Sequence, residues 1–291
     1  MNSTINLVDL FCGAGGLSLG FEKAGINILT ALDNNMDSIN TYSNNIQTEY
    51  KPLLKSINHI TPEELLSYIK FNSGELDLLI GGPPCRGFSF ANRQSRTKTN
   101  NYNNLIFRYL EFIKVIKPKM FVLENVIGLM NFLDGTVYQD FIQGIKKLKY
   151  VLNEQIFNCE DYGIPQKRER IIIIGTRRRK KVNLNLRKQK IIPVKKAISD
   201  LPDLCNGNRD DPLNYKNNLN ISNYQEEMRS TNESNEVRNN SVTKNNEIVL
   251  ERYKHIPQGG NWRNIPPRLM KNYSNIENCH SSIYHLSLIH I

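Results

Sequence analysis

The segment Gly81-Gly82-Pro83-Pro84-Cys85 places a cysteine in a setting suited to nucleophilic chemistry. It follows an apolar run, 76–80, that predicts a buried strand. Two prolines fix the backbone ahead of Cys85, and the glycines leave space around it. Nucleophilic catalysis requires a rigid and accessible cysteine. Because open α/β sheets bind ligands at the carboxyl ends of their strands, we predict that Cys85 is a catalytic nucleophile.

The remaining cysteines lack such a setting, so we interpret them as buried small apolar residues: Cys12, Cys159, Cys205 and Cys279. The spacing of the five cysteines is irregular and includes no Cys-x-x-Cys pair, which argues against a disulfide framework and a structural zinc site. The first residues lack the basic-then-apolar pattern of a signal peptide, and no apolar run is long enough to span a bilayer. We predict no metal, no membrane association and a reducing, cytoplasmic location.

A glycine-rich loop, Gly13-Ala14-Gly15-Gly16, is the second element with chemical potential. A loop of this kind between a strand and a helix lets a ligand approach the backbone next to a positive helix N-terminus. Ser18 stands where the dinucleotide fingerprint has its third glycine. Asp33, about 20 residues further on, can accept hydrogen bonds from two ribose hydroxyls. These features predict an adenosyl ligand without a pyrophosphate, the alternative being a tight turn with a helix cap.

The charge of this 291-residue chain is concentrated in one block. The formal net charge is +10, from 38 Lys and Arg against 28 Asp and Glu. Residues 164–196 contain 13 of the basic residues and a single acid, Glu169. A local basic block is typical of a surface that contacts a polyanion, the alternative being a solvated loop.

These candidate residues require a scaffold of alternating strands and helices. Fully apolar strands that alternate with helices indicate a doubly wound, mostly parallel α/β sheet. We expect strands at 5–10, 26–32, 76–80, 120–123 and 171–174, and helices at 17–24, 37–44, 105–116 and 138–148. Beyond about residue 192 the amino-acid composition changes, and residues 206–246 contain 13 asparagines and few large apolar side chains. We expect a smaller, loop-rich region there.

Four motifs in a fixed order carry a family resemblance: Asp9-Leu-Phe-Cys-Gly-Ala-Gly-Gly, Gly-Gly-Pro-Pro-Cys85, Glu124-Asn125-Val126 and Gln166-Lys-Arg168-Glu-Arg170. Through them the chain resembles the cytosine-C5 DNA methyltransferases of bacterial restriction-modification systems over roughly residues 5–180. The resemblance implies the S-adenosylmethionine-dependent methyltransferase fold, with a catalytic, cofactor-binding domain at 1–190 and an incomplete target-recognition domain at 191–291. It implies double-stranded DNA as substrate, a monomer, and a cognate restriction endonuclease encoded nearby.

The resemblance also assigns the catalytic roles. Cys85 would add to C6 of a flipped-out cytosine, which makes C5 nucleophilic enough to attack the methyl group of S-adenosylmethionine. Glu124 would contact ring N3 and the exocyclic amine, and a proton given at N3 would neutralise the developing charge. Arg168 would hold the base O2, while Arg170 would support the site and a nearby phosphate. Because alternate residues of a strand share a face, these two arginines can point to the same side.

The same resemblance names binding residues. Those for S-adenosylmethionine are Phe11, Gly13, Gly15, Leu17, Asp33, Asn34, Ile57, Pro83 and Leu105. Phe11 and Asn34 would flank the adenine, and Asp33 would bind the ribose. Those for DNA are Arg86, Ser89, Arg93, Arg96, Gln166, Gly259, Gly260 and Arg263. The only tryptophan, Trp262, lies beside this last group and suits a buried core role as well as a DNA contact.

The chain departs from the family pattern at several positions. Ser56 stands where family members carry an acid that contacts the adenine amine, and Arg86 replaces the usual Gln after the nucleophile. The basic and polar segment 92–104 suits a loop that closes on DNA. We see neither the Arg-Glu-rich segment nor the final helix of the family, so we expect a truncated fragment. Residues 286–291 match one translation of a common transposon-type sequencing adapter, and we hypothesise that they are assembly read-through.

Three functions follow from these observations. The first is methylation of cytosine C5 in duplex DNA, and the second is the same chemistry on tRNA. The long recognition-like segment and the Gln258-Gly-Gly-Asn-Trp262 motif favour DNA. The third is an inactive, truncated DNA-binding fragment.

Overall fold

The computed structural model of this chain describes residues 4–84, 104–177, 181–217, 220–230, 234–257 and 259–271. The chain forms two compact units. The first comprises Met1–Phe157 and Glu169–Leu186, and the second comprises Asn158–Arg168 and Arg187–Ile291. Each unit is described separately below.

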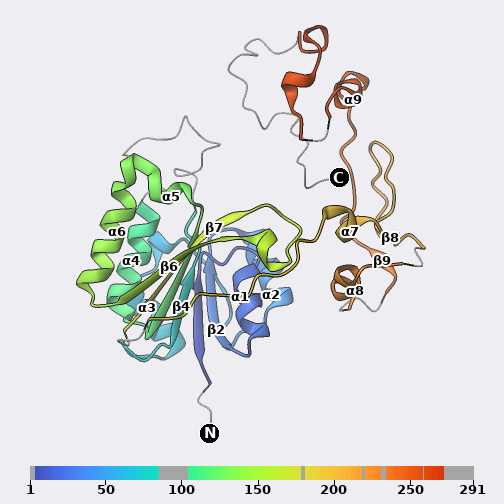
Figure 1. The fold of residues 1–291 in the computed structure, drawn as a ribbon. Helices are drawn as coiled ribbons and strands as arrows, with labels where there is room; N and C mark the ends of the chain where they lie inside the picture. The colour runs from blue at the N-terminus through green and yellow to red at the C-terminus, as the bar shows by residue number, and fades with distance from the viewer. Residues whose placement is uncertain are drawn as a thin grey trace. The chain divides into compact units, whose positions relative to one another are not determined.

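The first unit is built on a seven-stranded sheet with the order β3-β2-β1-β4-β5-β7-β6 (Figure 1). Its strands are β1 (Asn6–Leu10), β2 (Asn27–Asp33), β3 (Leu53–Leu54), β4 (Leu78–Gly81), β5 (Met120–Asn125), β6 (Val151–Asn158) and β7 (Glu169–Thr176). The neighbouring pairs β3–β2, β2–β1, β1–β4 and β4–β5 are parallel, whereas β5 and β7 are antiparallel. The expected doubly wound, mostly parallel sheet is therefore confirmed.

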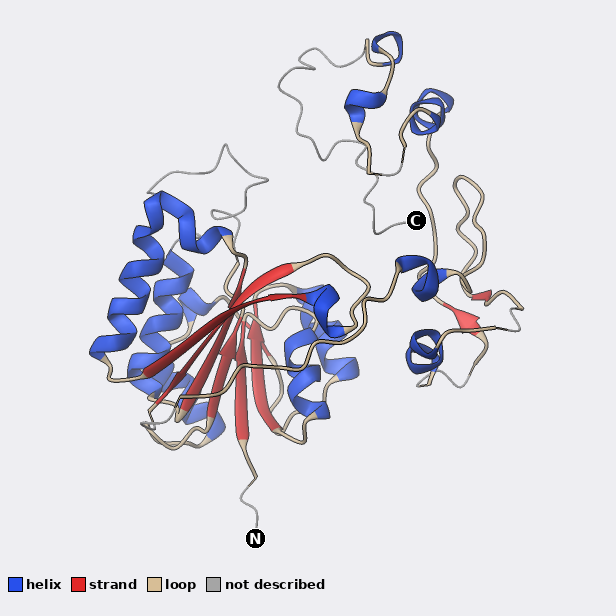
Figure 2. Ribbon diagram, viewed as in Figure 1, coloured by secondary structure: helices blue, strands red, loops and turns tan. Residues whose placement is uncertain are grey.

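Helices cover both faces of this sheet (Figure 2). They are α1 (Gly16–Lys23), α2 (Met36–Asn45), η1 (Ile57–His59), α3 (Pro62–Ile69), α4 (Asn104–Ile116), α5 (Gly128–Asn131), η4 (Phe132–Gly135) and α6 (Thr136–Lys147). One core cluster joins the sheet to α3, α4 and α6 through residues such as Leu65, Tyr109 and Phe141. A second joins it to α2 through Ile39 and Tyr42, and Phe21 of α1 packs against this cluster. Burial of both faces explains why the central strands read as continuous apolar runs.

The sequence missed six elements of this unit: β3, η1, α3, α5, η4 and β6. Strand β3 is only two residues long, too short for any periodic pattern. Helix α3 has a clear start, because Thr61 and Glu64 form a capping box and Pro62 occupies its first turn. Strand β6 lies at the sheet edge and alternates half-buried with exposed residues over part of its length. No helix in the described part of the chain is long and apolar enough to cross a membrane.

The second unit consists of short elements joined by long connections. They are η5 (Cys159–Tyr162), α7 (Val194–Ile198), β8 (Leu213–Asn214), α8 (Asn223–Arg229), β9 (Glu236–Val237), α9 (Glu247–Lys254), η6 (Trp262–Asn264) and η7 (Pro267–Leu269). Strands β8 and β9 form a two-stranded antiparallel sheet. The expected loop-rich character is therefore present. The unit comprises Asn158–Arg168 and Arg187–Ile291, and the division into a catalytic domain at 1–190 and a target-recognition domain at 191–291 stays a prediction.

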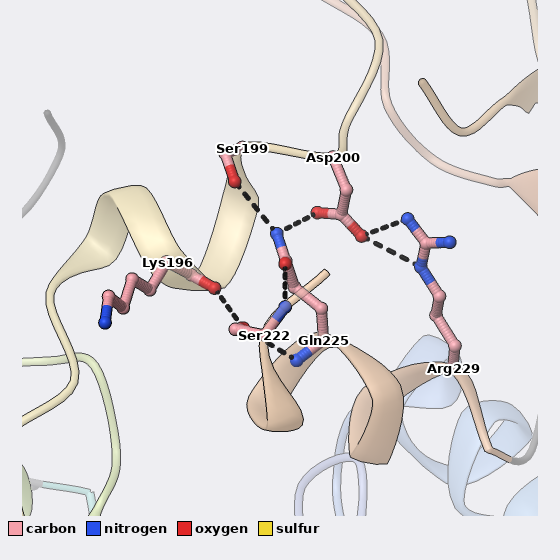
Figure 3. Close-up of polar contacts among 6 residues, drawn as sticks. All are labelled: Lys196, Ser199, Asp200, Ser222, Gln225 and Arg229. Atoms are coloured by element: carbon pink, nitrogen blue, oxygen red, sulfur yellow. Dashed lines mark hydrogen bonds and ion pairs between the residues drawn. The ribbon is translucent and has the colours of Figure 1, made fainter. Parts of the chain in front are cut away.

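A buried polar cluster organises α7 and α8 of this unit (Figure 3). The carboxylate of Asp200, only 2% exposed, accepts hydrogen bonds from Gln225 Nε2 at 2.8 Å and Arg229 Nε at 2.9 Å. The Arg229 guanidinium also lies 3.8 Å from the centre of the Tyr215 ring. Ser222 caps α8, and its hydroxyl donates to the Lys196 carbonyl oxygen. Because this unit has few large apolar residues, polar contacts hold α7 and α8 together in place of a hydrophobic core.

Candidate active site

The glycine loop between β1 and α1 has the backbone that the sequence predicts. Gly15 has a φ of 97°, and a Cβ placed there would lie 2.9 Å from the Tyr42 ring. Only glycine satisfies both conditions, because L-residues rarely adopt such a φ and the ring leaves no space. Phe11 also adopts a positive φ, 63°, as the chain leaves β1. The loop is therefore fixed by its conformation and by the packing beneath it.

Asp33 at the end of β2 is tied to this loop. Its Oδ2 accepts a hydrogen bond from the Gly13 backbone N–H at 2.9 Å, and its Oδ1 accepts one from the Asn35 N–H at 2.9 Å. A carboxylate has about four lone-pair sites, so two remain for further donors. The carboxylate is thus held in place while it keeps capacity for a pair of hydroxyls.

A cavity of about 330 Å³ opens at the carboxyl ends of these strands. It is lined by Phe11, Leu32, Asp33, Asn34, Lys55, Ser56, Ile57, Pro84 and Leu105. Five of these nine residues were predicted for the cofactor. Its size lies within the usual range for cofactor sites, roughly 300–1,000 Å³. One aromatic ring, aliphatic side chains and a fixed carboxylate match the adenine and ribose of S-adenosylmethionine, so the residues present fit that group.

Four predicted cofactor residues do not line the cavity. Gly13 and Gly15 shape the loop, and Leu17 packs on the core cluster beneath α1 and α2. Pro83 is buried, and the cavity is lined by the next residue, Pro84. The sequence missed Leu32, Lys55 and Pro84 as lining residues, although each is adjacent to a residue or motif that it singled out.

Beneath the loop lies a buried carboxyl group, Asp9, that the sequence motif contained without a role. Asp9 Oδ2 accepts a hydrogen bond from Ser18 Oγ at 2.6 Å, and Ser18 in turn accepts one from the Tyr42 hydroxyl at 2.8 Å. Burial raises the pKa of Asp9 to about 7, partly opposed by the Ser18 hydrogen bond. The chain of hydrogen bonds links β1 to α1 and α2.

The described cysteines differ in their surroundings. Cys12 is buried, and burial raises the pKa of its thiol well above the usual range, which confirms its interpretation as a small apolar residue. Cys159 is half-buried and Cys205 is exposed, so that interpretation was wrong for Cys205. Cys205 lies among turns in the sparsely packed second unit, where little apolar surface is available to cover it.

Glu124 and Arg170 form an ion pair across two antiparallel strands. Arg170 Nε lies 2.8 Å from Glu124 Oε1, and the side chains are 20% and 31% exposed. Glu124 on β5 pairs in register with Ile172 on β7, so Arg170 is two residues from its position. Residues two apart point to the same side of a strand, which brings the two side chains together. A partly exposed carboxylate is thereby held at the end of β5.

The Gly82-Pro84 segment joins this pair to the cavity. A Cβ at Gly82 would lie 3.2 Å from Glu124 Oε2. The buried Asn125 amide donates from Nδ2 to the Pro83 carbonyl oxygen at 3.2 Å. Asn125 belongs to the Glu124-Asn125-Val126 motif, but the sequence did not identify it as an anchor for the proline segment. Pro84 then reaches the cavity wall.

Other predicted site residues belong to the second unit or lie outside the described residues. Cys85, Arg86, Ser89, Arg93, Arg96 and Cys279 lie outside the described residues. Arg168 and Gln166 belong to the second unit and are exposed, and β7 begins only after Arg168. The shared orientation of Arg168 and Arg170 therefore stays a prediction.

The remaining predicted DNA contacts lie in the last part of the second unit. Gly259 has a φ of 75°, and Gly260 N–H donates to the Pro257 carbonyl oxygen at 2.8 Å, which closes a tight turn. Arg263 is exposed and lies 5.0 Å from the Trp262 ring centre. Trp262 is 9% exposed, so it takes the buried role.

Comparison with known proteins identifies the class and then the family. The fold is that of the S-adenosylmethionine-dependent methyltransferases. Residues 5–287 match the C-5 cytosine-specific DNA methylase family, and the chain belongs to that family.

Individual relatives agree with this assignment. The chain is 35% identical over 175 residues to the Type II methyltransferase M1.HphI of Haemophilus parahaemolyticus, covering 59% of this chain and 46% of that protein. It is 30% identical over 277 residues to M.DdeI of Desulfomicrobium norvegicum, covering 90% and 63%. The chain thus spans about half to two thirds of the length of these relatives.

A solved structure supports the same fold. It is described as a candidate DNA modification methyltransferase encoded within a prophage of E. coli, and it shares 25% sequence identity with this chain. The TM-score is 0.71, and the match covers 88% of this chain and 76% of that one.

Proposed function

We propose that this chain transfers a methyl group from S-adenosylmethionine to C5 of cytosine in a specific double-stranded DNA sequence. The observation that carries the proposal is the connection, within one compact unit, between a cavity suited to an adenosyl group and the Glu124–Arg170 pair. The segment that connects them ends at Pro84, immediately before the predicted nucleophile. The names of the relatives, Type II methyltransferases, support duplex DNA over tRNA.

The cavity residues would hold the cofactor. Asp33 would accept hydrogen bonds from the ribose hydroxyls with the lone pairs left free by Gly13 and Asn35. Phe11 would contact the adenine, and Ile57 and Leu105 would cover apolar parts of the molecule. When bound, S-adenosylmethionine supplies an electrophilic methyl group on a sulfonium. Ser56 lines the cavity where the family pattern has an acid, so a hydroxyl would meet the adenine edge.

The protein residues would activate the base. The Cys85 thiolate would form a bond to C6 of a flipped-out cytosine, which pushes electron density to C5. Glu124 would give a proton to N3 and accept a hydrogen bond from the exocyclic amine. C5 then takes the methyl group and loses its proton to a base. The bond from Cys85 to C6 breaks as the thiolate leaves, and N3 returns its proton to Glu124, which restores aromaticity. Arg170 would keep the Glu124 carboxyl aimed at the base.

The second unit would recognise the target sequence. Arg168 would hold the base O2, and Gln166, Gly259, Gly260 and Arg263 would contact DNA. Seven of the 13 basic residues of 164–196 belong to this unit and support this role, because phosphate contacts depend on Lys and Arg. A cognate restriction endonuclease would be the functional partner.

A covalent trap tests the chemistry. Duplex DNA with 5-fluorocytosine at target sites, incubated with the chain and S-adenosylmethionine, should give an adduct at Cys85 detectable by mass spectrometry. The Cys85→Ser variant should give no adduct yet still bind DNA, and the matched variant Cys205→Ser should give the same adduct as wild type.

The outcomes separate the alternatives. Methylation of tRNA but not duplex DNA would favour the tRNA enzyme. A well-folded chain that binds DNA without adduct formation would indicate an inactive fragment. If S-adenosylmethionine fails to raise the melting temperature, the cofactor proposal is wrong, because a ligand that binds the folded state must stabilise that state.

A further inference from the structure

Arg108 on α4 makes an unusual set of contacts with a distant segment. One terminal nitrogen, Nη2, donates to the backbone carbonyl oxygens of Ile57 at 2.9 Å and Ile60 at 3.0 Å. The other, Nη1, pairs with Glu111. The guanidinium carbon also lies 5.5 Å from the Phe112 ring centre. The side chain is 23% exposed, so the group is largely fixed by protein contacts.

The accepting carbonyls are those that a short helix leaves without partners. Helix η1 spans Ile57–His59, and Ile60 follows it. The last carbonyls of a helix lack intrahelical donors, and arginine side chains are suited to satisfy them. Ile57 and Ile60 are both buried, at 3% and 4% exposed, which makes water a poor substitute. One guanidinium therefore completes the end of η1.

These contacts join two walls of the cavity. Ile57 lines one wall, and Leu105, one turn before Arg108 on α4, lines another. The two walls are about 50 residues apart in the chain and are not joined by strand pairing. A hydrogen bond from a charged donor contributes more to stability than one between neutral groups. Arg108 does not itself line the cavity.

We propose that Arg108 is a positioning residue that fixes the width of the cofactor cavity. It acts by holding the Ser56-Ile57 wall against α4 before the cofactor binds. This rests on the proposed function in that the ligand is S-adenosylmethionine. A preformed site binds more tightly than one that must be ordered on binding. Loss of Arg108 should therefore weaken cofactor binding and leave the chemical step unchanged at saturating cofactor.

The test compares Arg108→Met and Arg108→Lys with two controls in the full chain. Glu111→Gln removes the charge that pairs with Arg108 without touching η1. Tyr150→Phe removes a buried hydrogen bond to the Pro118 carbonyl, away from the cavity, and serves as a destabilised reference. Calorimetry should show an S-adenosylmethionine Kd raised about tenfold in Arg108→Met and less in Arg108→Lys, with both controls within about twofold of wild type. KM for the cofactor should rise while kcat and KM for DNA stay unchanged.

Amide hydrogen exchange gives a readout that needs no ligand. Exchange in the peptide that spans 57–61 should accelerate in Arg108→Met and recover in Arg108→Lys, but should match wild type in Tyr150→Phe. Unchanged exchange and unchanged cofactor affinity in Arg108→Met would overturn the inference. A wild-type chain that does not bind S-adenosylmethionine would instead overturn the proposed cofactor, and the exchange result would still show whether Arg108 orders this wall. If Arg108→Met fails to fold, Arg108→Gln, which also lacks the charge and the reach of the guanidinium, carries both measurements.

Discussion

Arg170 holds the Glu124 carboxylate at 2.8 Å across the antiparallel pair of β7 and β5. These residues are 46 positions apart, and only strand register brings them together. Oε1 of this carboxylate pairs with the Arg170 guanidinium, and Oε2 lies beside Gly82. The carboxylate is thus held in one orientation by the protein itself.

Replacing Arg170 by Met should impair the chemical step. Without the guanidinium, Glu124 loses its orientation, and we expect kcat for DNA methylation to fall by about 10²-fold, as for other lost electrostatic contacts. Calorimetry should give an unchanged Kd for S-adenosylmethionine, because neither residue lines the cavity. Arg170→Lys should recover part of the rate. An Arg170→Met enzyme with wild-type kcat would show that the ion pair has no catalytic role.

The Asp33 carboxylate should be required for cofactor affinity. Asp33→Asn keeps the shape but loses the charge and acceptor capacity, so we expect the S-adenosylmethionine Kd to rise about tenfold or more. Asp37→Asn, an exposed acid in the first turn of α2, is the matched control. Titration calorimetry on both variants decides the point. Equal affinities would remove Asp33 from the cofactor site.

The buried Asp9 should make stability depend on pH. Its pKa is about 7 in the folded chain, against an ordinary value of 3.8 for an aspartate in water, so the folded state binds the proton more tightly. This contribution is fully present below pH 4, declines as the pH rises toward 7, and is constant above that. Compared with Asp9→Asn, the free energy of unfolding of the wild type should fall by up to roughly 4 kcal/mol between about pH 4 and pH 7. Denaturant unfolding of both proteins at several pH values tests this, and a constant difference would contradict it.

A methyl group at Gly15 should destabilise the glycine loop. Gly15→Ala combines a positive φ with a contact of 2.9 Å to the Tyr42 ring, so we expect a loss of about 1–3 kcal/mol. At the neighbouring Gly16 no atom lies within 4 Å of an added Cβ, so Gly16→Ala should be neutral or slightly stabilising in α1. Thermal unfolding measures both. Equal melting temperatures would mean that the loop relaxes without cost.

Asp200 should be essential to the second unit. Asp200→Asn leaves the Arg229 charge without its buried partner, and breaking such pairs costs roughly 3–5 kcal/mol. Asp203→Asn is the control, because that carboxylate is 92% exposed although it pairs with Lys216. Limited proteolysis should cut the second unit of Asp200→Asn quickly while the first unit persists. Wild-type resistance in Asp200→Asn would show that the cluster in Figure 3 is dispensable.

The amino-acid sequence determined the first unit to a large extent. Apolar strands alternating with amphipathic helices demand a doubly wound sheet, and in such a sheet the loops that follow the strands meet at one edge. That argument alone brings the loop after β1 to Asp33 after β2, and both contribute to the cavity. These signals are local, so a single sequence contains them.

Tertiary structure decided what depends on register and burial. Only the antiparallel placement of β7 sets Arg170 beside Glu124, because local periodicity does not specify which strands pair. The raised pKa of Asp9 comes from surroundings that no motif describes. Arg108 reaches the carbonyl of Ile57, in a helix three residues long, and that of Ile60 just beyond it, and so short a helix has no pattern in the sequence. Likewise, the assignment of Asn158–Arg168 to the second unit follows from contacts made far along the chain, such as that of Asp161 with Lys188.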